Sequence, residues 1–255
     1  SEVAGRKRRG FWSSFQYVTL IMGQLFALSV LLILQQFLTA EQLTDWGWRI
    51  PFFLGTICAL MAFWVRTGIS ETSSFEAMKR RATVVQTWKL MSEHPRELLT
   101  VCGLTMGGTI AFYTFSTYAQ KFLVNTSGFT KDSASQIAAA SLVVFMLVQP
   151  VMGQLSDIVG RKPLLIAFSA IGALTTVPLM TMIGATKDAP TAFILVTLAL
   201  INISMYTSIG AVFKAELFPS EIRALGVGLP YALMVSLFGG TAEYVALWLK
   251  NAGHE

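Results

Sequence analysis

Long apolar stretches alternate along the chain with shorter polar segments. A helix needs roughly 20 apolar residues to cross the core of a bilayer, and seven stretches reach that length: 15–38, 46–65, 98–118, 134–154, 164–184, 191–213 and 226–249. Lipid cannot hydrogen-bond a free backbone, which favours helices, and the stretches are too long for the alternating strands of an outer-membrane barrel. The pattern therefore predicts an all-α membrane protein with seven transmembrane helices.

Composition and charge distribution agree with that prediction. Hydrophobic residues make up 54% of the chain and charged residues 13%, against about 25% charged residues in a soluble domain. With a cytoplasmic N-terminus, the inner segments hold fourteen of the nineteen Lys and Arg residues, as the positive-inside rule requires. The net charge of +5 is then a sign of topology, not of nucleic-acid binding. We expect a multi-pass protein of the inner (plasma) membrane.

The polar segment 66–97 divides the chain into two unequal parts. Two apolar stretches precede it and five follow it. We expect residues 1–65 to end an N-terminal helical bundle, residues 66–97 to form a central cytoplasmic loop, and residues 98–255 to form most of a C-terminal bundle. Because the chain begins at Ser1 without a Met and stops directly after a stretch, we expect it to be a piece of a larger protein.

Enzyme and channel chemistry find little support in the sequence. The two histidines, His94 and His254, lie in the inner loop and at the C-terminus. We find no metal-ligand pair, no phosphate-binding loop and no nucleophile–base set, and no filter-like segment or ring of charges. We therefore expect neither enzymatic activity nor a metal or cofactor.

The most specific motif is G-Q-L-S-D-I-V-G-R-K at residues 153–162, between the fourth and fifth stretches. Gly153 and Gly160 allow close helix approach and a tight turn. Asp157 can face the positive N-terminal end of a neighbouring helix, and Arg161 and Lys162 suit the anionic inner leaflet. An ordinary charged turn is a poor alternative for this spacing between two spans.

This motif resembles the loop signature of the major facilitator superfamily in its second-half copy. Further segments resemble the metabolite–proton symporter family within it: 14–17, 46–52, 112–115, 120–121, 214–219, 223–228 and 239–247. The resemblance implies two six-helix bundles around a central cavity, with alternating access. The seven spans would then be the fifth to eleventh of twelve.

The resemblance also implies a function. We expect proton symport of a small dicarboxylate such as α-ketoglutarate, by a protein that works as a monomer when full length. Symport of another metabolite or osmolyte (citrate, shikimate, proline or betaine) is the alternative, ahead of a membrane enzyme or a channel. The expected partners are therefore a small organic acid, protons and the lipid bilayer.

Two charged residues of the spans each have two interpretations. Arg49, at the outer start of the second span, either captures a substrate carboxylate bidentately or anchors the helix in an aromatic belt with Trp46 and Trp48. Glu243, inside the seventh span, is either a proton-coupling carboxylate or a structural partner for a Tyr or Arg across the bundle, because a charge at that depth needs a partner, water or a proton. Arg49 and Glu243 can also pair with each other.

By resemblance, the first, third and sixth spans line the cavity. Their polar residues are candidates for substrate contact: Gln16, Gln24, Tyr113, Tyr118, Asn202 and Tyr206. Lys214, Glu216 and Arg223 lie at the inner ends of the last two spans, where snorkelling explains each of them singly. The family pattern implies instead a gate latch near Asp157, which would face the start of the first span at residues 11–14.

Overall fold

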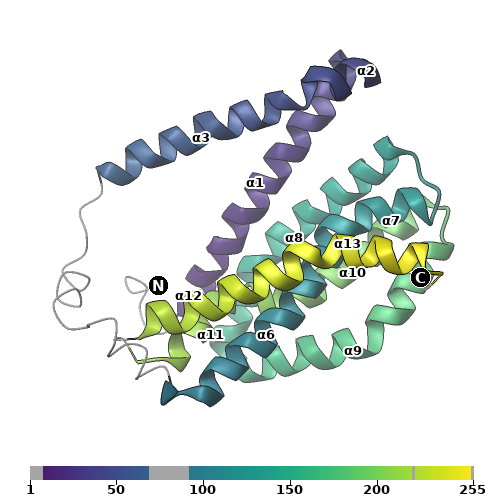
Figure 1. The fold of residues 1–255 in the computed structure, drawn as a ribbon. Helices are drawn as coiled ribbons and strands as arrows, with labels where there is room; N and C mark the ends of the chain where they lie inside the picture. Colours follow the sequence, from purple (N-terminus) through teal and green to yellow (C-terminus); the bar gives the residue numbers. More distant parts are fainter. Residues whose placement is uncertain (1–7, 69–91, 220–221, 254–255) are drawn as a thin grey trace.

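The computed structural model describes residues 8–68, 92–219 and 222–253, and these residues fold into helices joined by short connections (Figure 1). Most of the predicted central loop, residues 69–91, lies outside the described residues. The elements in chain order are α1 (Arg9–Phe37), α2 (Ala40–Gln42), η2 (Leu43–Gly47), α3 (Arg49–Thr67), α6 (Pro95–Tyr113), η3 (Thr114–Tyr118), α7 (Ala119–Asn125), α8 (Lys131–Val159), α9 (Arg161–Ala185), α10 (Ala189–Thr207), α11 (Gly210–Leu217), α12 (Arg223–Met234), η4 (Val235–Gly239) and α13 (Gly240–Asn251).

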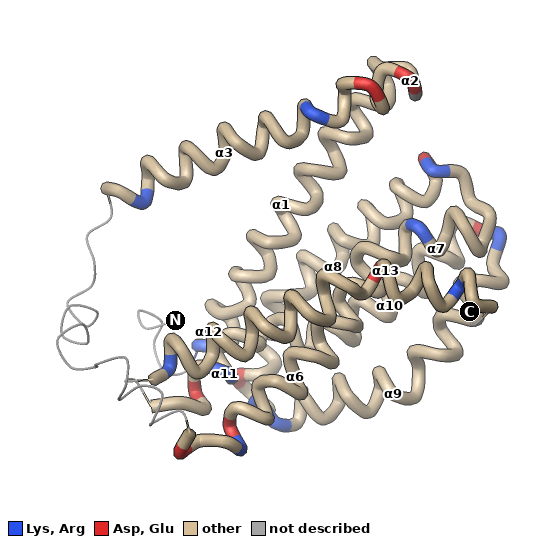
Figure 2. The backbone as a smooth tube through the Cα atoms, in the orientation of Figure 1, with Lys and Arg blue, Asp and Glu red and all other residues tan. Residues whose placement is uncertain are grey.

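The prediction of seven membrane-spanning helices is confirmed. Within the described part of the chain, seven helices are long and apolar enough to cross a bilayer: Arg9–Phe37, Leu43–Thr67, Pro95–Asn125, Lys131–Val159, Arg161–Ala185, Ala189–Leu217 and Arg223–Asn251. Charged residues lie mainly at the two ends of the bundle, and the middles of the helices carry few (Figure 2). That distribution is the one expected of helices that span an apolar layer.

Helix α10 lies at the centre of the bundle, where it packs against α6, α8 and α9. Its residues Leu200 and Ile203, together with Phe145 of α8 and Leu123 of α7, are almost completely buried in one apolar core. Helix α1 packs along α8, and its buried residues all fall between Gly10 and Ile21. The start of α1 is therefore held in the bundle, whereas its far end and α3 stand apart from it (Figure 1).

The bundle has a motif end, where α1 begins and the 153–162 loop lies, and a far end opposite it (Figure 1). At the motif end, Gly160 separates α8 from α9 with a φ of 94°. This left-handed backbone conformation strains residues that carry a Cβ. The glycine thus allows the tight turn that the sequence predicted.

Three of the spans are irregular near their middles. The span that begins with α6 contains a π-helical turn, η3, and the span that begins with α12 contains another, η4. The sixth span is interrupted at residues 208–209, between α10 and α11. Such irregularities are frequent at functional sites. Helix α6 packs against η4 so closely that a Cβ on Gly239 would lie 2.6 Å from the Tyr113 ring.

Candidate functional site

At the motif end, the Asp157 carboxylate caps the N-terminus of α1. The backbone N–H groups of Gly10 and Phe11 donate to its two oxygens at 2.8 and 2.9 Å. Helix α1 has no side-chain cap from Arg8, its own N-cap residue. The first N–H groups of a helix need acceptors, and a carboxylate also complements the positive end of the helix dipole. Asp157 therefore joins α8 to α1, at the end of the first span where the resemblance placed its contact.

Arg161 extends this contact into a charge network. Its guanidinium donates to Asp157 Oδ1 at 2.9 Å and to the Ser156 carbonyl at 3.1 Å. It also lies 3.5 Å from the Glu216 carboxylate, and Glu216 in turn lies 4.0 Å from Arg9. The network connects α1, α8, α9 and α11 at the motif end.

Arg223 and Lys162, also expected in the gate, lie outside this network. Arg223 donates instead to the Phe218 carbonyl at 3.4 Å, a contact within its own neighbourhood of the chain. Lys162 is exposed beside Arg161. The described network therefore contains Asp157, Arg161 and Glu216 from the predicted gate set.

Glycines let α1 and α8 cross in backbone contact beside this network. A Cβ on Gly10 would lie 2.2 Å from Ser156 Oγ and 2.5 Å from the Gly153 carbonyl oxygen. A Cβ on Gly153 would lie 2.6 Å from the Gly10 carbonyl oxygen. Real Cβ atoms do not approach other atoms so closely, and the neighbours include backbone, which cannot rotate away. The short Asp157 contacts thus depend on small residues at this crossing.

Deeper in the bundle, four tyrosines from different helices lie together, and two of them flank one lysine. Tyr17 of α1 interacts electrostatically with Tyr113 of α6, Tyr206 of α10 and Tyr231 of α12. The Lys214 ammonium of α11 lies 4.6 Å from the centroid of the Tyr231 ring and 5.3 Å from that of the Tyr206 ring. Lys214 is only 3% exposed. We call these five residues the tyrosine–lysine cluster.

The lysine of this cluster keeps an uncompensated charge. A lysine within a span costs about 2.5–3.5 kcal/mol on insertion scales, and each aromatic face offsets about 0.5–2 kcal/mol of that cost. Among the described residues, no Asp or Glu forms an ion pair with Lys214. The rings therefore stabilise the ammonium but do not neutralise it.

The position of Lys214 corrects the sequence interpretation. Snorkelling to the nearer membrane surface would have left its ammonium exposed beside Glu216. The side chain instead runs back toward Tyr206, two helical turns earlier in the chain. Helical Cα–Cβ bonds tilt toward the helix N-terminus, and α11 runs toward the motif end, so this direction leads into the bundle. The direction in which a lysine points along its helix could have been inferred from the sequence, and it was not considered there.

At the far end, Glu243 forms an ion pair with Lys121 of α7. The exposed fractions of the two side chains are 38% and 50%. Lys250 makes a second link between these segments, because it donates to the Asn125 carbonyl at 3.1 Å and to Thr126 Oγ1 at 3.0 Å. Glu243 thus has a lysine partner on α7, where the sequence had suggested a Tyr or Arg.

This pairing predicts a small effect for Glu243→Gln. We expect a loss of less than about 1 kcal/mol in unfolding free energy, because exposed ion pairs typically contribute 0.2–1 kcal/mol. A double-mutant cycle with Lys121→Met, read by thermal unfolding, measures the pair. We also expect Glu243→Gln to leave the pH dependence of uptake unchanged. Loss of pH-driven uptake with retained substrate exchange would contradict this and assign Glu243 to proton coupling.

The remaining polar candidates of the first two spans lie in different surroundings. Gln24 donates to the Ser116 carbonyl of η3 at 3.2 Å, so it contacts the third span. Gln16 is exposed on the same helix. Arg49 is exposed, donates to the Asp45 carbonyl at 2.7 Å, and lies 4.7 Å from the centroid of the Trp48 ring. The contacts of Arg49 are those of an interfacial anchor.

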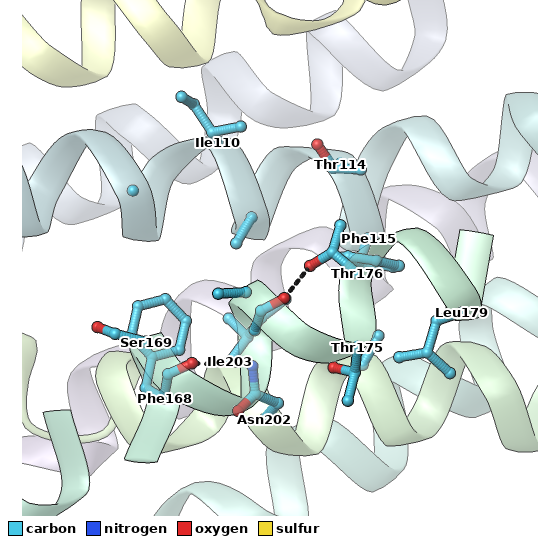
Figure 3. Close-up of a pocket in the computed structure, with 15 residues that line it drawn as sticks. Ile110, Thr114, Phe115, Phe168, Ser169, Thr175, Thr176, Leu179, Asn202 and Ile203 are labelled. Atoms are coloured by element: carbon cyan, nitrogen blue, oxygen red, sulfur yellow. Dashed lines mark hydrogen bonds between the residues drawn. The ribbon is translucent and has the colours of Figure 1, made fainter. Parts of the chain in front are cut away.

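A pocket of about 410 Å³ opens between α6, α9 and α10 (Figure 3). Its lining is largely apolar and includes Phe168, Phe115 and Ile203, and no charged residue is among its lining residues. Asn202 lies on its wall and donates to the Phe168 carbonyl at 3.3 Å. Tyr118 is buried in the apolar core, with its ring 6.1 Å from that of Phe122. Neither Asn202 nor Tyr118 belongs to the tyrosine–lysine cluster.

Sequence comparison decides the family of this chain. Residues 1–242 match the Major Facilitator Superfamily. The chain belongs to this superfamily. Membership agrees with the helical fold and with the motif at residues 153–162. The family and the permease-named relative indicate a multi-pass inner-membrane transporter, not an enzyme.

The chain is also similar to individual transport proteins, to different degrees. The chain is 48% identical, over 100% of its length and 59% of the relative, to the alpha-ketoglutarate permease of Escherichia coli. It is 29% identical to an ectoine/proline transporter of Corynebacterium glutamicum, over 98% of this chain and 52% of that one. It is also 29% identical to a citrate-proton symporter of Klebsiella pneumoniae, over 96% and 55%. No solved structure matches it. The chain thus spans between half and three fifths of the length of each of these relatives.

Proposed function

We propose that this chain is part of a proton symporter that carries a small dicarboxylate such as α-ketoglutarate across the inner membrane. The observation that carries the proposal is the 48% identity to alpha-ketoglutarate permease along the whole chain. The relatives named for citrate and for ectoine and proline are 29% identical over similar ranges. The difference in identity favours the dicarboxylate over an osmolyte.

In this proposal, residues 1–65 belong to the N-terminal bundle and residues 98–255 to the C-terminal bundle, with 66–97 as the cytoplasmic connection. The motif end faces the cytoplasm, since most Lys and Arg residues lie in the segments at that side. Among the described residues, the main contacts of α3 are with η2 and α1, and this supports placing α3 apart from the C-terminal bundle. The full-length protein works as a monomer, and protons move with the substrate.

The charge network at the motif end acts as a cytoplasmic gate. Its members come from α1 on one side and from α8, α9 and α11 on the other. Rocking of the two bundles would break the Asp157 contacts when the motif end opens and restore them when it closes. The converging start of α1 and its diverging far end support a state that is closed at the motif end (Figure 1).

Residues of three helices face the transported substrate in this proposal. Tyr113 and Tyr206 are retained because they belong to the tyrosine–lysine cluster. Gln16 and Gln24 are retained because they lie on α1, the helix that carries Tyr17 of the cluster. We do not extend the proposal to Tyr118 and Asn202, whose contacts are with the core and with α9. For Arg49 we propose the anchor role.

Uptake assays test this function. The protein expressed from its complete gene is reconstituted in vesicles, and radiolabelled α-ketoglutarate uptake is measured with and without a pH gradient. We expect saturable uptake that a protonophore abolishes and that excess citrate, proline or betaine inhibits weakly. Proton-driven uptake of betaine or proline without α-ketoglutarate uptake would overturn the dicarboxylate proposal.

A further inference from the structure

Among the described residues, no Asp or Glu pairs with Lys214, which lies in the bundle as a cation. It follows the break between α10 and α11 at residues 208–209, is 3% exposed, and extends into the bundle away from the motif end. Glu216, two residues later on the same helix, pairs with Arg161 and Arg9. The carboxylate nearest in sequence is therefore committed to the gate, and Lys214 is separate from that network.

The groups around Lys214 leave one chemical role open. Tyr206 and Tyr231 present ring faces to the ammonium, at 5.3 and 4.6 Å from the ring centroids. Ring faces attract a cation but accept no strong hydrogen bond, so the three N–H donors of the ammonium remain available. Tyr113, which interacts electrostatically with Tyr17 and Tyr231, carries a hydroxyl group that can also donate. A carboxylate is the group that complements one ammonium beside phenol donors.

We propose that the Lys214 ammonium binds a carboxylate group of the transported substrate. This inference rests on the proposed function, because it takes the substrate to be an organic acid. The helices that carry the cluster, α1, α6, α10, α11 and α12, include the span that is broken at residues 208–209. Interrupted helices are frequent at the binding sites of secondary transporters, near the membrane midplane.

The named substrates of the relatives limit what Lys214 selects. The names give α-ketoglutarate, citrate, and ectoine or proline, all of which contain at least one carboxylate. A lone ammonium recognises that shared group. Lys214 therefore supplies affinity for the carboxylate, and the choice among organic acids falls to other residues.

Substrate kinetics of the reconstituted protein, expressed from its complete gene, test the proposal. Lys214→Met keeps the volume and removes the charge, and exposed Lys131 of the far end provides the matched control, Lys131→Met. We expect Lys214→Met to raise the KM for α-ketoglutarate at least about thirtyfold, as for loss of one partner of a buried charge pair. Lys131→Met leaves KM unchanged, and Lys214→Arg, which keeps the charge, retains part of the affinity. Lys214→Gln takes the same place in the assay should the Met variant not fold.

A second readout separates binding from a merely structural role. Competition by two monocarboxylate analogues, each lacking one carboxylate of α-ketoglutarate, is measured for wild type and Lys214→Met. In the wild type both analogues compete less well than α-ketoglutarate. In Lys214→Met, removal of the carboxylate that Lys214 binds no longer weakens competition, and removal of the other still does.

The possible failures are distinguishable. One outcome is that the wild-type protein takes up α-ketoglutarate and Lys214→Met has the same KM or the same preferences among the analogues. This outcome overturns the assignment of Lys214 and leaves the proposed function intact. A wild-type protein that takes up none of the organic acids overturns the proposed function, and the Lys214 assignment with it.

Discussion

Replacement of Asp157 by Asn is expected to lower the initial rate of substrate uptake at least about tenfold. The carboxylate accepts hydrogen bonds from the Gly10 and Phe11 N–H groups and pairs with Arg161. In Asn, one of the two oxygens becomes an NH2 group, which is a donor and faces a donor. Hydrogen bonds to charged groups contribute about 1.5–3 kcal/mol, and a change of about 1.4 kcal/mol is tenfold in an equilibrium. Conformations closed at the motif end therefore lose most of their population.

Asp132→Asn is the matched control for this prediction. Asp132 lies in the first turn of the same helix, α8, and is exposed at the far end. Uptake by both variants is compared in vesicles that contain equal amounts of folded protein. A rate for Asp157→Asn within about twofold of the Asp132→Asn rate would show that the carboxylate does not control the cycle.

The number and order of the membrane helices followed from the sequence, because bilayer thickness fixes the length of each apolar stretch. The ends of the helices did not follow. The first stretch was predicted to begin at residue 15, but α1 begins at Arg9. Its additional turn is stabilised by Asp157, nearly 150 residues later in the chain. A cap supplied by another helix leaves no sign in the local hydropathy.

The third span shows the same limit at its other end. The apolar pattern stops at residue 118, yet the helix continues through α7 to Asn125. The additional residues include Lys121, whose partner Glu243 lies in α13. Polar residues at a membrane surface remain helical when neighbouring helices provide partners. Partners of this kind become visible only when the packing is known.

The candidate site was predicted in part. The motif at residues 153–162 singled out Asp157 and Arg161, which the structure joins in one charge network, because charge in a short turn between two apolar stretches has few structural explanations. Tyr113 and Tyr206 were named from their place in apolar helices. Lys214 was assigned to snorkelling or to the gate latch, because its distance from the helix end permits both snorkelling and burial. The choice depends on which neighbouring helices cover it, and here those are the helices of Tyr206 and Tyr231.

The crossing of α1 and α8 makes Gly10→Ala the second change with a large expected effect. The new Cβ would lie 2.5 Å from the Gly153 carbonyl oxygen and 2.2 Å from Ser156 Oγ, so the two helices must separate. Overpacking of this kind costs about 1–3 kcal/mol, and separation also lengthens the Gly10–Asp157 hydrogen bond, now 2.8 Å. We expect uptake to fall about tenfold or more.

The matched control for Gly10→Ala is on the same helix. Gly23→Ala adds the same Cβ to α1, where no atom lies within 4 Å of it, and uptake should remain near that of the wild type. Distances between spin labels at two exposed positions, Trp12 of α1 and Val159 of α8, report the separation directly. An unchanged distance distribution and normal uptake in Gly10→Ala would contradict a gate that depends on this contact. A longer distance in Gly10→Ala and in Asp157→Asn, but not in Gly23→Ala, would show that the glycine and the carboxylate close the motif end together.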